Sequence, residues 1–229
     1  EVRALGPLEV FVGGRPLEGD AFGSSRPREL LLLLLWHPEG RTREQVGLEF
    51  WPDASAAQVK NSFHVTLHHL RKALGGSDWI VIDGDRYRIA PDRAVELDAG
   101  RFEVEARRLL KQTDPSEETL RDILALYRGD LLEGEVTGAW VEEHRDRLRR
   151  LAVDLTLALG AALEAREDHA AAADLYRGLV AREDLNEEAH RRLMRAWARA
   201  GDRAPPLPHN QRRVTHHRGE RDAQPQPQP

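Results

Sequence analysis

Hydrophobic residues between positions 57 and 74 repeat with the period of an α-helix. Phe63, Leu67, Leu70 and Leu74 follow one another at intervals of three or four residues, which places them on one side of a helix. The other side carries basic and polar residues and no carboxylate: Lys60, Asn61, His64, His68 and Arg71. A helix that packs by one face and presents amides, imidazoles and cations on the other suits a DNA major groove. The alternative is an ordinary amphipathic surface helix, since such faces are common.

The residues that follow this helix favour the first interpretation. Gly75 and Gly76 end the helix, because glycine is the preferred residue beyond a helix C-terminus. Residues 79–82 and 86–89 then alternate as two short strands around the turn 83–85, which predicts a β-hairpin. A basic helix followed directly by a short hairpin is the layout of a winged helix.

The preceding residues complete an N-terminal unit. A leucine-rich run at 28–36 predicts a buried helix, and at about ten residues it is too short to span a membrane. Thr42 and Gln45 form a predicted capping box that opens a second helix through about residue 51. Upstream, residues 8–12 and 15–17 flank two glycines and predict another β-hairpin. We therefore expect a domain over residues 1–94 with the order hairpin, three helices, hairpin.

The second half of the chain predicts helices only. The expected helices cover 99–111, 117–127 (with Ser116 as N-cap), 140–166, 170–182 and 187–200. Small and aromatic residues at helical spacing in the last two resemble the packing positions of a helical repeat, which predicts a domain over residues 95–204. A plain helical bundle is the alternative. From residue 205 prolines oppose a helix, so residues 205–229 are expected to form a disordered or poorly packed tail, or a flexible tail without a structural role.

Several short segments resemble those of one bacterial family. They lie at residues 5–10, 26–31, 50–53, 61–65 and 70–74 in the first half, and at 126–134, 140–143 and 186–194 in the second. Together they make residues 2–204 similar to the SARP family of activators of antibiotic pathways. The resemblance implies a mostly α fold with small β-hairpins. It consists of an N-terminal OmpR/PhoB-type winged helix-turn-helix and an all-α, tetratricopeptide-like bacterial transcriptional activator domain.

The resemblance also implies roles for particular segments. The helix at 57–74 corresponds to the DNA-recognition helix. The loop before it corresponds to the turn that OmpR-type activators present to RNA polymerase, here Pro52, Asp53, Ala54 and Ser55. Two departures prevent any transfer of base preference. His68 and His69 replace mid-helix arginines, and Arg86 stands where many relatives have glycine before a Tyr-Arg pair.

Charge complicates a DNA-binding function. The net charge is −5, and phosphate neutralisation supplies most non-specific affinity for DNA. Placement offsets the total, because residues 54–76 contain three charged side chains, all basic. We predict base-edge contacts from Asn61, His64 and His68, and phosphate contacts from a second group: Lys60, Arg71, Lys72, Arg86 and Arg88.

The expected function is a sequence-specific transcriptional regulator, an activator that binds promoter repeats in double-stranded DNA and contacts RNA polymerase, with possible self-association on DNA. The alternative is a helical-repeat interaction scaffold whose winged helix does not bind DNA, which the acidic balance favours slightly. No enzyme, cofactor or metal site is expected. Residues His64 and His68 have a metal-compatible spacing but no third ligand, and the chain has no cysteine. Without a signal peptide or membrane span, a cytoplasmic location is expected.

Overall fold

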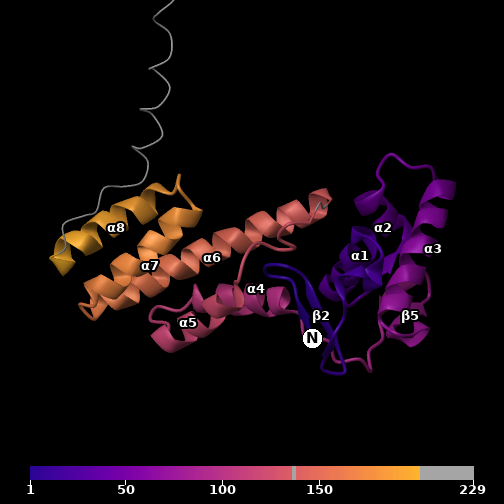
Figure 1. Ribbon diagram of the computed structural model, residues 1–229, viewed down its shortest axis with the longest axis horizontal. Helices are drawn as coiled ribbons and strands as arrows, with labels where there is room; N and C mark the ends of the chain where they lie inside the picture. Colours follow the sequence, from indigo (N-terminus) through magenta and orange to yellow (C-terminus); the bar gives the residue numbers. More distant parts are fainter. Residues whose placement is uncertain (136–137, 202–229) are drawn as a thin grey trace, which may run out of the picture.

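The computed structural model describes residues 1–135 and 138–201. A winged-helix unit occupies one end of the molecule and a helical unit the other (Figure 1). The first unit contains β1 (Val2–Arg3), β2 (Glu9–Val12), β3 (Arg15–Pro16), η1 (Gly19–Phe22), α1 (Ser25–Trp36), β4 (Arg41–Thr42), α2 (Arg43–Phe50), α3 (Ala56–Ala73), η2 (Ser77–Trp79), β5 (Ile80–Asp83) and β6 (Arg86–Ile89). The second contains α4 (Asp98–Leu109), α5 (Glu117–Leu126), α6 (Ala139–Ala165), α7 (His169–Arg182) and α8 (Glu187–Ala200).

The predicted mostly α fold with small β-hairpins is confirmed, and each hairpin gains a short third strand. The N-terminal sheet has the order β1-β2-β3, and the wing sheet has the order β4-β6-β5, with all neighbours antiparallel. The two-residue strands β1 and β4 were not predicted, because so short a segment carries no alternation of apolar and polar side chains. Strand β4 joins the wing to the start of α2 and so fixes the hairpin against the helices.

Three helices form the core of the winged-helix unit. Five consecutive leucines of α1 are buried, residues 30–34, so this helix is enclosed on most sides as its sequence predicts. It begins three residues earlier than predicted, at Ser25, and so contains Pro27 in its first turn. Proline is tolerated there because the first N–H groups of a helix have no intrahelical acceptor. The predicted capping box at the start of α2 is present, with Thr42 accepting from the Gln45 backbone and Gln45 accepting from Thr42.

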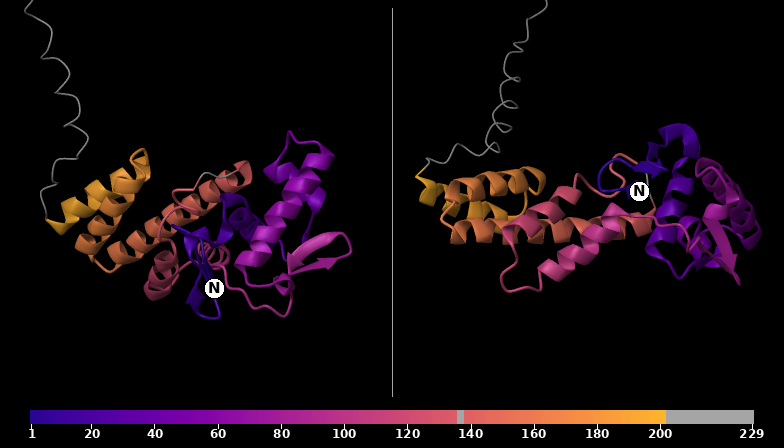
Figure 2. Two further views of the ribbon diagram at one scale, coloured as in Figure 1. Left: turned by 45° about the vertical axis from the view of Figure 1, so that its right-hand side comes forward. Right: turned by 90° about the horizontal axis from the view of Figure 1, so that it is seen from below.

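The helical unit is organised around α6, a helix of 27 residues. Its N-terminal end lies beside the winged-helix unit, while α7 and α8 form an antiparallel pair at its other end (Figures 1 and 2). Asp168 and Asn186 cap α7 and α8 through their side chains. Ser116 occupies the predicted N-cap position of α5, but its side chain accepts no capping hydrogen bond.

The two units share one continuous hydrophobic core. Val2 of β1 donates its backbone N–H to the Glu96 carbonyl, and Leu132 donates to the Ala4 carbonyl just after β1, so the N-terminal segment is held by residues before α4 and after α5. The Asp98 carboxylate accepts backbone N–H groups from Ala4 at 2.7 Å and Leu5 at 3.2 Å. The domain boundary near residue 94 stays a prediction.

The predicted disordered tail, residues 205–229, lies outside the described residues. Among the helices described, none has the length and apolar character needed to cross a membrane.

Candidate DNA-binding surface

Helix α3 is fixed in place by its apolar side. Phe63, Leu67 and Leu70 are buried, and Phe63 meets the Tyr87 ring of β6 edge-on at a centroid distance of 4.6 Å. Helix α2 approaches α3 closely, because Gly47 faces Val59 with room for no larger side chain. A second capping box starts α3, with Ser55 accepting from the Gln58 backbone. The sequence therefore sets both the start of α3 and the side by which it packs.

The opposite side of α3 forms the candidate site. Asn61, Val65, His68 and Lys72 follow at intervals of four, three and four residues, so they form one exposed row along the helix, which we call the α3 row. His64 is exposed beside this row, and Lys60 is exposed toward the start of the helix. The residues predicted to contact base edges thus share one accessible face.

Sequence reasoning missed one member of the α3 row. Val65 is 57% exposed, one of the few large apolar side chains of the described chain that are open to solvent. Valine has no polar group, so it was not among the residues predicted to contact bases or phosphates. Its spacing from Asn61 and Lys72 is the signal that identifies it.

His69 lies beside the row rather than in it. This side chain is half-buried, and its ring lies next to Gly23 at the end of η1. The packing separates His69 from the exposed His64 and His68, so two of the three imidazoles of α3 belong to the candidate surface.

The three arginines predicted to contact phosphates all bond within the protein. Arg71 donates to the Ile80 carbonyl at 2.8 Å, and Arg86 donates to the Gly40 carbonyl at 3.1 Å. Arg88 forms an ion pair with Asp83 at 3.0 Å. Arg71 and Arg86 therefore hold the wing against the helices, and any phosphate contact would have to use their remaining N–H groups.

The tip of the wing is acidic. Asp83 and Asp85 are both exposed on either side of Gly84, whose φ of 65° suits the tight turn. Ile82 is also 56% exposed. Because like charges repel, a tip with two carboxylates opposes contact with phosphates unless the paired Arg88 is released.

The predicted polymerase-contact loop is accessible in part. Pro52, Asp53 and Ser55 are exposed, while Ala54 is half-buried and its N–H bonds to the Trp51 carbonyl. Next to this loop, Leu48 of α2 is 73% exposed.

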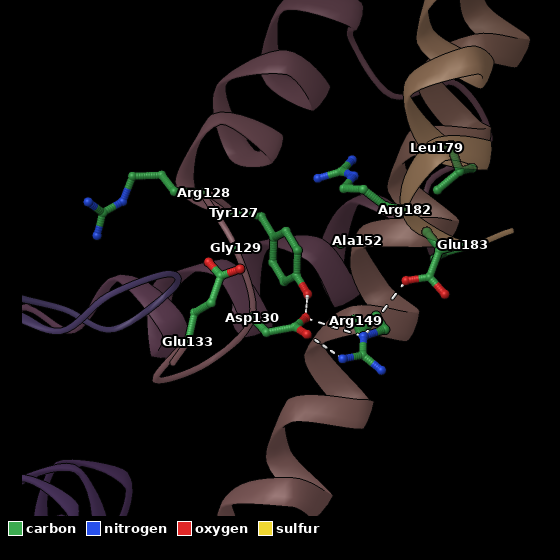
Figure 3. A pocket seen from close by; sticks show the side chains of 11 residues that line it. Tyr127, Arg128, Gly129, Asp130, Glu133, Arg149, Ala152, Leu179, Arg182 and Glu183 are labelled. Atoms are coloured by element: carbon green, nitrogen blue, oxygen red, sulfur yellow. Dashed lines mark hydrogen bonds and ion pairs between the residues drawn. The ribbon is translucent and has the colours of Figure 1, made fainter. Parts of the chain in front are cut away.

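A cavity of about 400 Å³ lies in the helical unit, between the α5–α6 loop, α6 and α7 (Figure 3). Four of its polar side chains bond to one another: Tyr127 donates to Asp130 at 2.6 Å, and Arg149 pairs with Asp130 and, at 3.7 Å, with Glu183. Burial opposes ionisation of Asp130, but the hydrogen bonds from Arg149 and Tyr127 outweigh it and hold the Asp130 pKa below its ordinary value. Burial, together with Asp130, raises the Tyr127 pKa. These bonds tie the α5–α6 loop to α6.

Where the units meet, one carboxylate, Glu29, is buried and another, Asp98, is half-buried. Glu29 is 0% exposed and accepts from Arg26 at 3.0 Å and from the Trp140 indole at 3.3 Å. Burial raises the pKa of Glu29 and that of Asp98. Within the described residues, no cluster of three or more His, Cys, Asp or Glu side chains could hold a metal ion.

Comparisons with known proteins agree with this architecture. No curated protein matches the chain. A solved structure of Mycobacterium tuberculosis EmbR in complex with a low affinity phosphopeptide superposes with a TM-score of 0.67 at 21% identity, covering 88% of this chain. The chain spans 56% of the length of that EmbR chain, and the likeness shows the fold: a winged helix followed by a helical domain.

The sequence also matches a known protein family over more than half of its length. The matching family is the bacterial transcriptional activator domain, and the match covers residues 97–228. This range begins at the end of the winged-helix unit and includes every helix of the helical unit. The chain belongs to the bacterial transcriptional activator domain family and is of the SARP type that its sequence motifs predict.

Proposed function

We propose that the chain is a sequence-specific transcriptional regulator that binds double-stranded DNA by inserting α3 into the major groove. The observation that carries this proposal is the exposed face of α3. It combines an amide, two imidazoles and two lysines with no carboxylate, although the whole chain has a net charge of −5. A purely structural face would have no reason to exclude acidic residues in so acidic a chain.

Each exposed side chain fits a particular role. The Asn61 amide can bond in bidentate fashion to adenine, while His64 and His68 can bond to base edges. Lys60 and Lys72 lie near opposite ends of the helix, where they can reach phosphates and fix its position in the groove. Arg71, Arg86 and Arg88 are proposed as supporting phosphate contacts, limited by their bonds within the protein.

We further propose that activation proceeds through the loop of residues 52–55, which contacts RNA polymerase. Pro52 and Asp53 are exposed there, and the nearby Leu48 adds an apolar side chain. An apolar anchor with a polar rim is common where two proteins meet. Copies bound side by side on promoter repeats would present several such loops.

The test is a fluorescence-anisotropy titration of labelled duplex DNA against salt. We expect Lys60→Ala with Lys72→Ala to weaken binding and to reduce the salt slope by about 1.8, because each lost phosphate contact releases about 0.9 counterion fewer. Lys111→Ala is the matched control, since Lys111 is an exposed lysine after α4 in the helical unit. Arg71→Ala is a poorer test, because it also removes a bond that holds the wing.

The alternative function makes the opposite prediction. If the chain is an interaction scaffold whose winged helix does not bind DNA, as its acidic balance favours, the double variant and the Lys111 control will give the same titration. That result would exclude α3 as a DNA-binding element.

A further inference from the structure

The α3 row has an apolar centre. Val65 lies one turn from Asn61 and one turn from His68, and it is 57% exposed while each of these neighbours is exposed as well. The apolar positions of α3 that serve the core, such as Phe63 and Leu67, lie on the other side of the helix and are buried. Val65 therefore lies outside the hydrophobic core, and packing within the protein does not explain an apolar side chain at this position.

The major groove offers one apolar group to such a side chain. Its edges present hydrogen-bond donors and acceptors on all four bases, and the 5-methyl group of thymine is the apolar exception. A branched aliphatic side chain cannot satisfy a donor or acceptor, so it leaves one desolvated and unpaired against any other base edge. Against a thymine methyl, it removes apolar surface from water on both partners.

We propose that Val65 selects thymine by packing on its 5-methyl group, and that it is the apolar specificity residue of α3. This inference rests on the proposed DNA-binding function. Four residues of helix rise about 6 Å, and successive base pairs are about 3.4 Å apart. When Asn61 bonds to an adenine, Val65 therefore meets a base within about two base-pair steps. The expected site contains an adenine and a thymine at that short spacing.

The other large apolar side chains exposed on the winged-helix unit, Ile82 and Leu48, are less well placed than Val65 to contact a base. Ile82 of the wing is similarly exposed, but it stands beside the acidic tip formed by Asp83 and Asp85, which phosphates repel. Leu48 lies on α2, outside the face that carries Asn61 and His68. Val65 is flanked instead by residues able to bond to bases and phosphates.

The test begins with selection of bound duplexes from random DNA by the full chain. Each thymine of the enriched site is then replaced by deoxyuridine, which removes the methyl group and leaves every hydrogen-bonding group in place. One such replacement is expected to weaken binding about three- to fivefold, the effect of one buried methyl group. Val65→Ala should cause a similar loss on the thymine site, and the replacement should then have no further effect.

The controls distinguish a failure of this inference from a failure of the proposed DNA-binding function on which it rests. Val104→Ala removes a valine that is 66% exposed on α4 and should leave both affinities unchanged. No enriched sequence at all would overturn the proposed function together with the inference. Enrichment of a site that lacks a sensitive thymine, or a deoxyuridine effect that persists in the Val65→Ala variant, would overturn the inference and leave DNA binding intact.

Discussion

At some single residues of this chain, the packing leaves no space for even one additional carbon atom. Gly160 of α6 faces the ring of Tyr176 of α7, and a β-carbon at residue 160 would lie 2.3 Å from that ring. Tyr176 is fully buried and donates its hydroxyl to Glu164 at 2.9 Å, so the ring cannot withdraw. The absence of one methyl group thus sets how closely α6 and α7 approach.

We expect Gly160→Ala to lower the free energy of unfolding by about 1 to 3 kcal/mol, because it overpacks a closed contact. Gly178→Ala is the matched control. Gly178 lies in α7 with no atom within 4 Å of its added β-carbon, and alanine there should stabilise the helix by about 0.5 to 1 kcal/mol. Urea unfolding of both variants measures the difference. Equal effects of the same sign would show that the α6–α7 contact is not tight.

The buried Glu29 makes stability depend on pH at one residue. Its pKa in the folded protein lies above the ordinary value of 4.5 because burial penalises the charged form. The stability that its protonated form contributes is therefore complete below about pH 4.5 and is lost as the pH rises through the folded pKa.

Glu29→Gln cannot ionise, so we expect its free energy of unfolding to fall less than that of the wild type between pH 4.5 and neutrality. Denaturant titrations at several pH values measure this slope. Glu39→Gln is a control, because the pKa of the exposed Glu39 is lowered, and this variant should not flatten the same slope. Parallel curves for wild type and Glu29→Gln would show that folding does not raise the Glu29 pKa.

At the scale of single elements, the wing differs most from expectation. Its second strand was predicted correctly, and its first was predicted one residue early, because β5 covers Ile80–Asp83 and pairs Asp83 with Arg86. The partners of its arginines were not predictable. Arg71 and Ile80 meet only after α3 and β5 have packed, and Gly40 meets Arg86 through the unforeseen strand β4. Sequence indicates which residues carry charge, whereas the fold decides which charges remain available.

The wing yields a prediction about DNA affinity. Asp83→Asn should release Arg88, tighten DNA binding roughly threefold and steepen the salt slope by about 0.9, because one more guanidinium becomes available to a phosphate. Asp85→Asn removes the same charge from the same turn, but Asp85 has no ion-pair partner among the described residues. Anisotropy titrations should therefore show a larger effect for residue 83. If both variants behave alike, Arg88 does not reach DNA.

Helix α3 shows how far local pattern can lead. Its period and the glycines after it gave both ends to within one residue, although its N-terminal capping box was not predicted. Lys60, Asn61, His64 and His68 of its polar face are exposed, whereas Arg71 is half-buried. The pattern did not identify Val65 as a site residue, because a single apolar residue among polar ones has no evident role until its exposure is known. Nor did it show that His69 turns toward η1, which depends on a segment more than forty residues away.

At the scale of the whole molecule, hydrogen bonds and a shared core hold the two units together, in addition to the segment of chain that connects them. Asp98 accepts N–H groups from Ala4, Leu5 and Ala99, while Glu29 of α1 bonds to Trp140 of α6. Helix content and order were predictable from the sequence. This junction was not, because the groups that meet in it lie about a hundred residues apart.

Asp98→Ala should lower the free energy of unfolding by about 2 to 3 kcal/mol, because the buried N–H groups of Ala4 and Leu5, just after β1, and of Ala99 in α4 would lose their acceptor. Asp92→Ala, at an exposed aspartate in the segment between the units, is the control and should have little effect. Thermal unfolding followed by circular dichroism measures both. If the two variants melt together, the junction contributes little to stability.

One consequence follows from α6 being a single uninterrupted helix. With 27 residues it is about 40 Å long, and it bonds to α1 near its first turn and packs on α7 toward its last. By geometry alone, a tilt of about 5° about the α7 contacts would move the end that bonds to α1, about 40 Å away, by about 3.5 Å. Any rotation of α6 about its α7 end is in this way enlarged at the winged-helix unit.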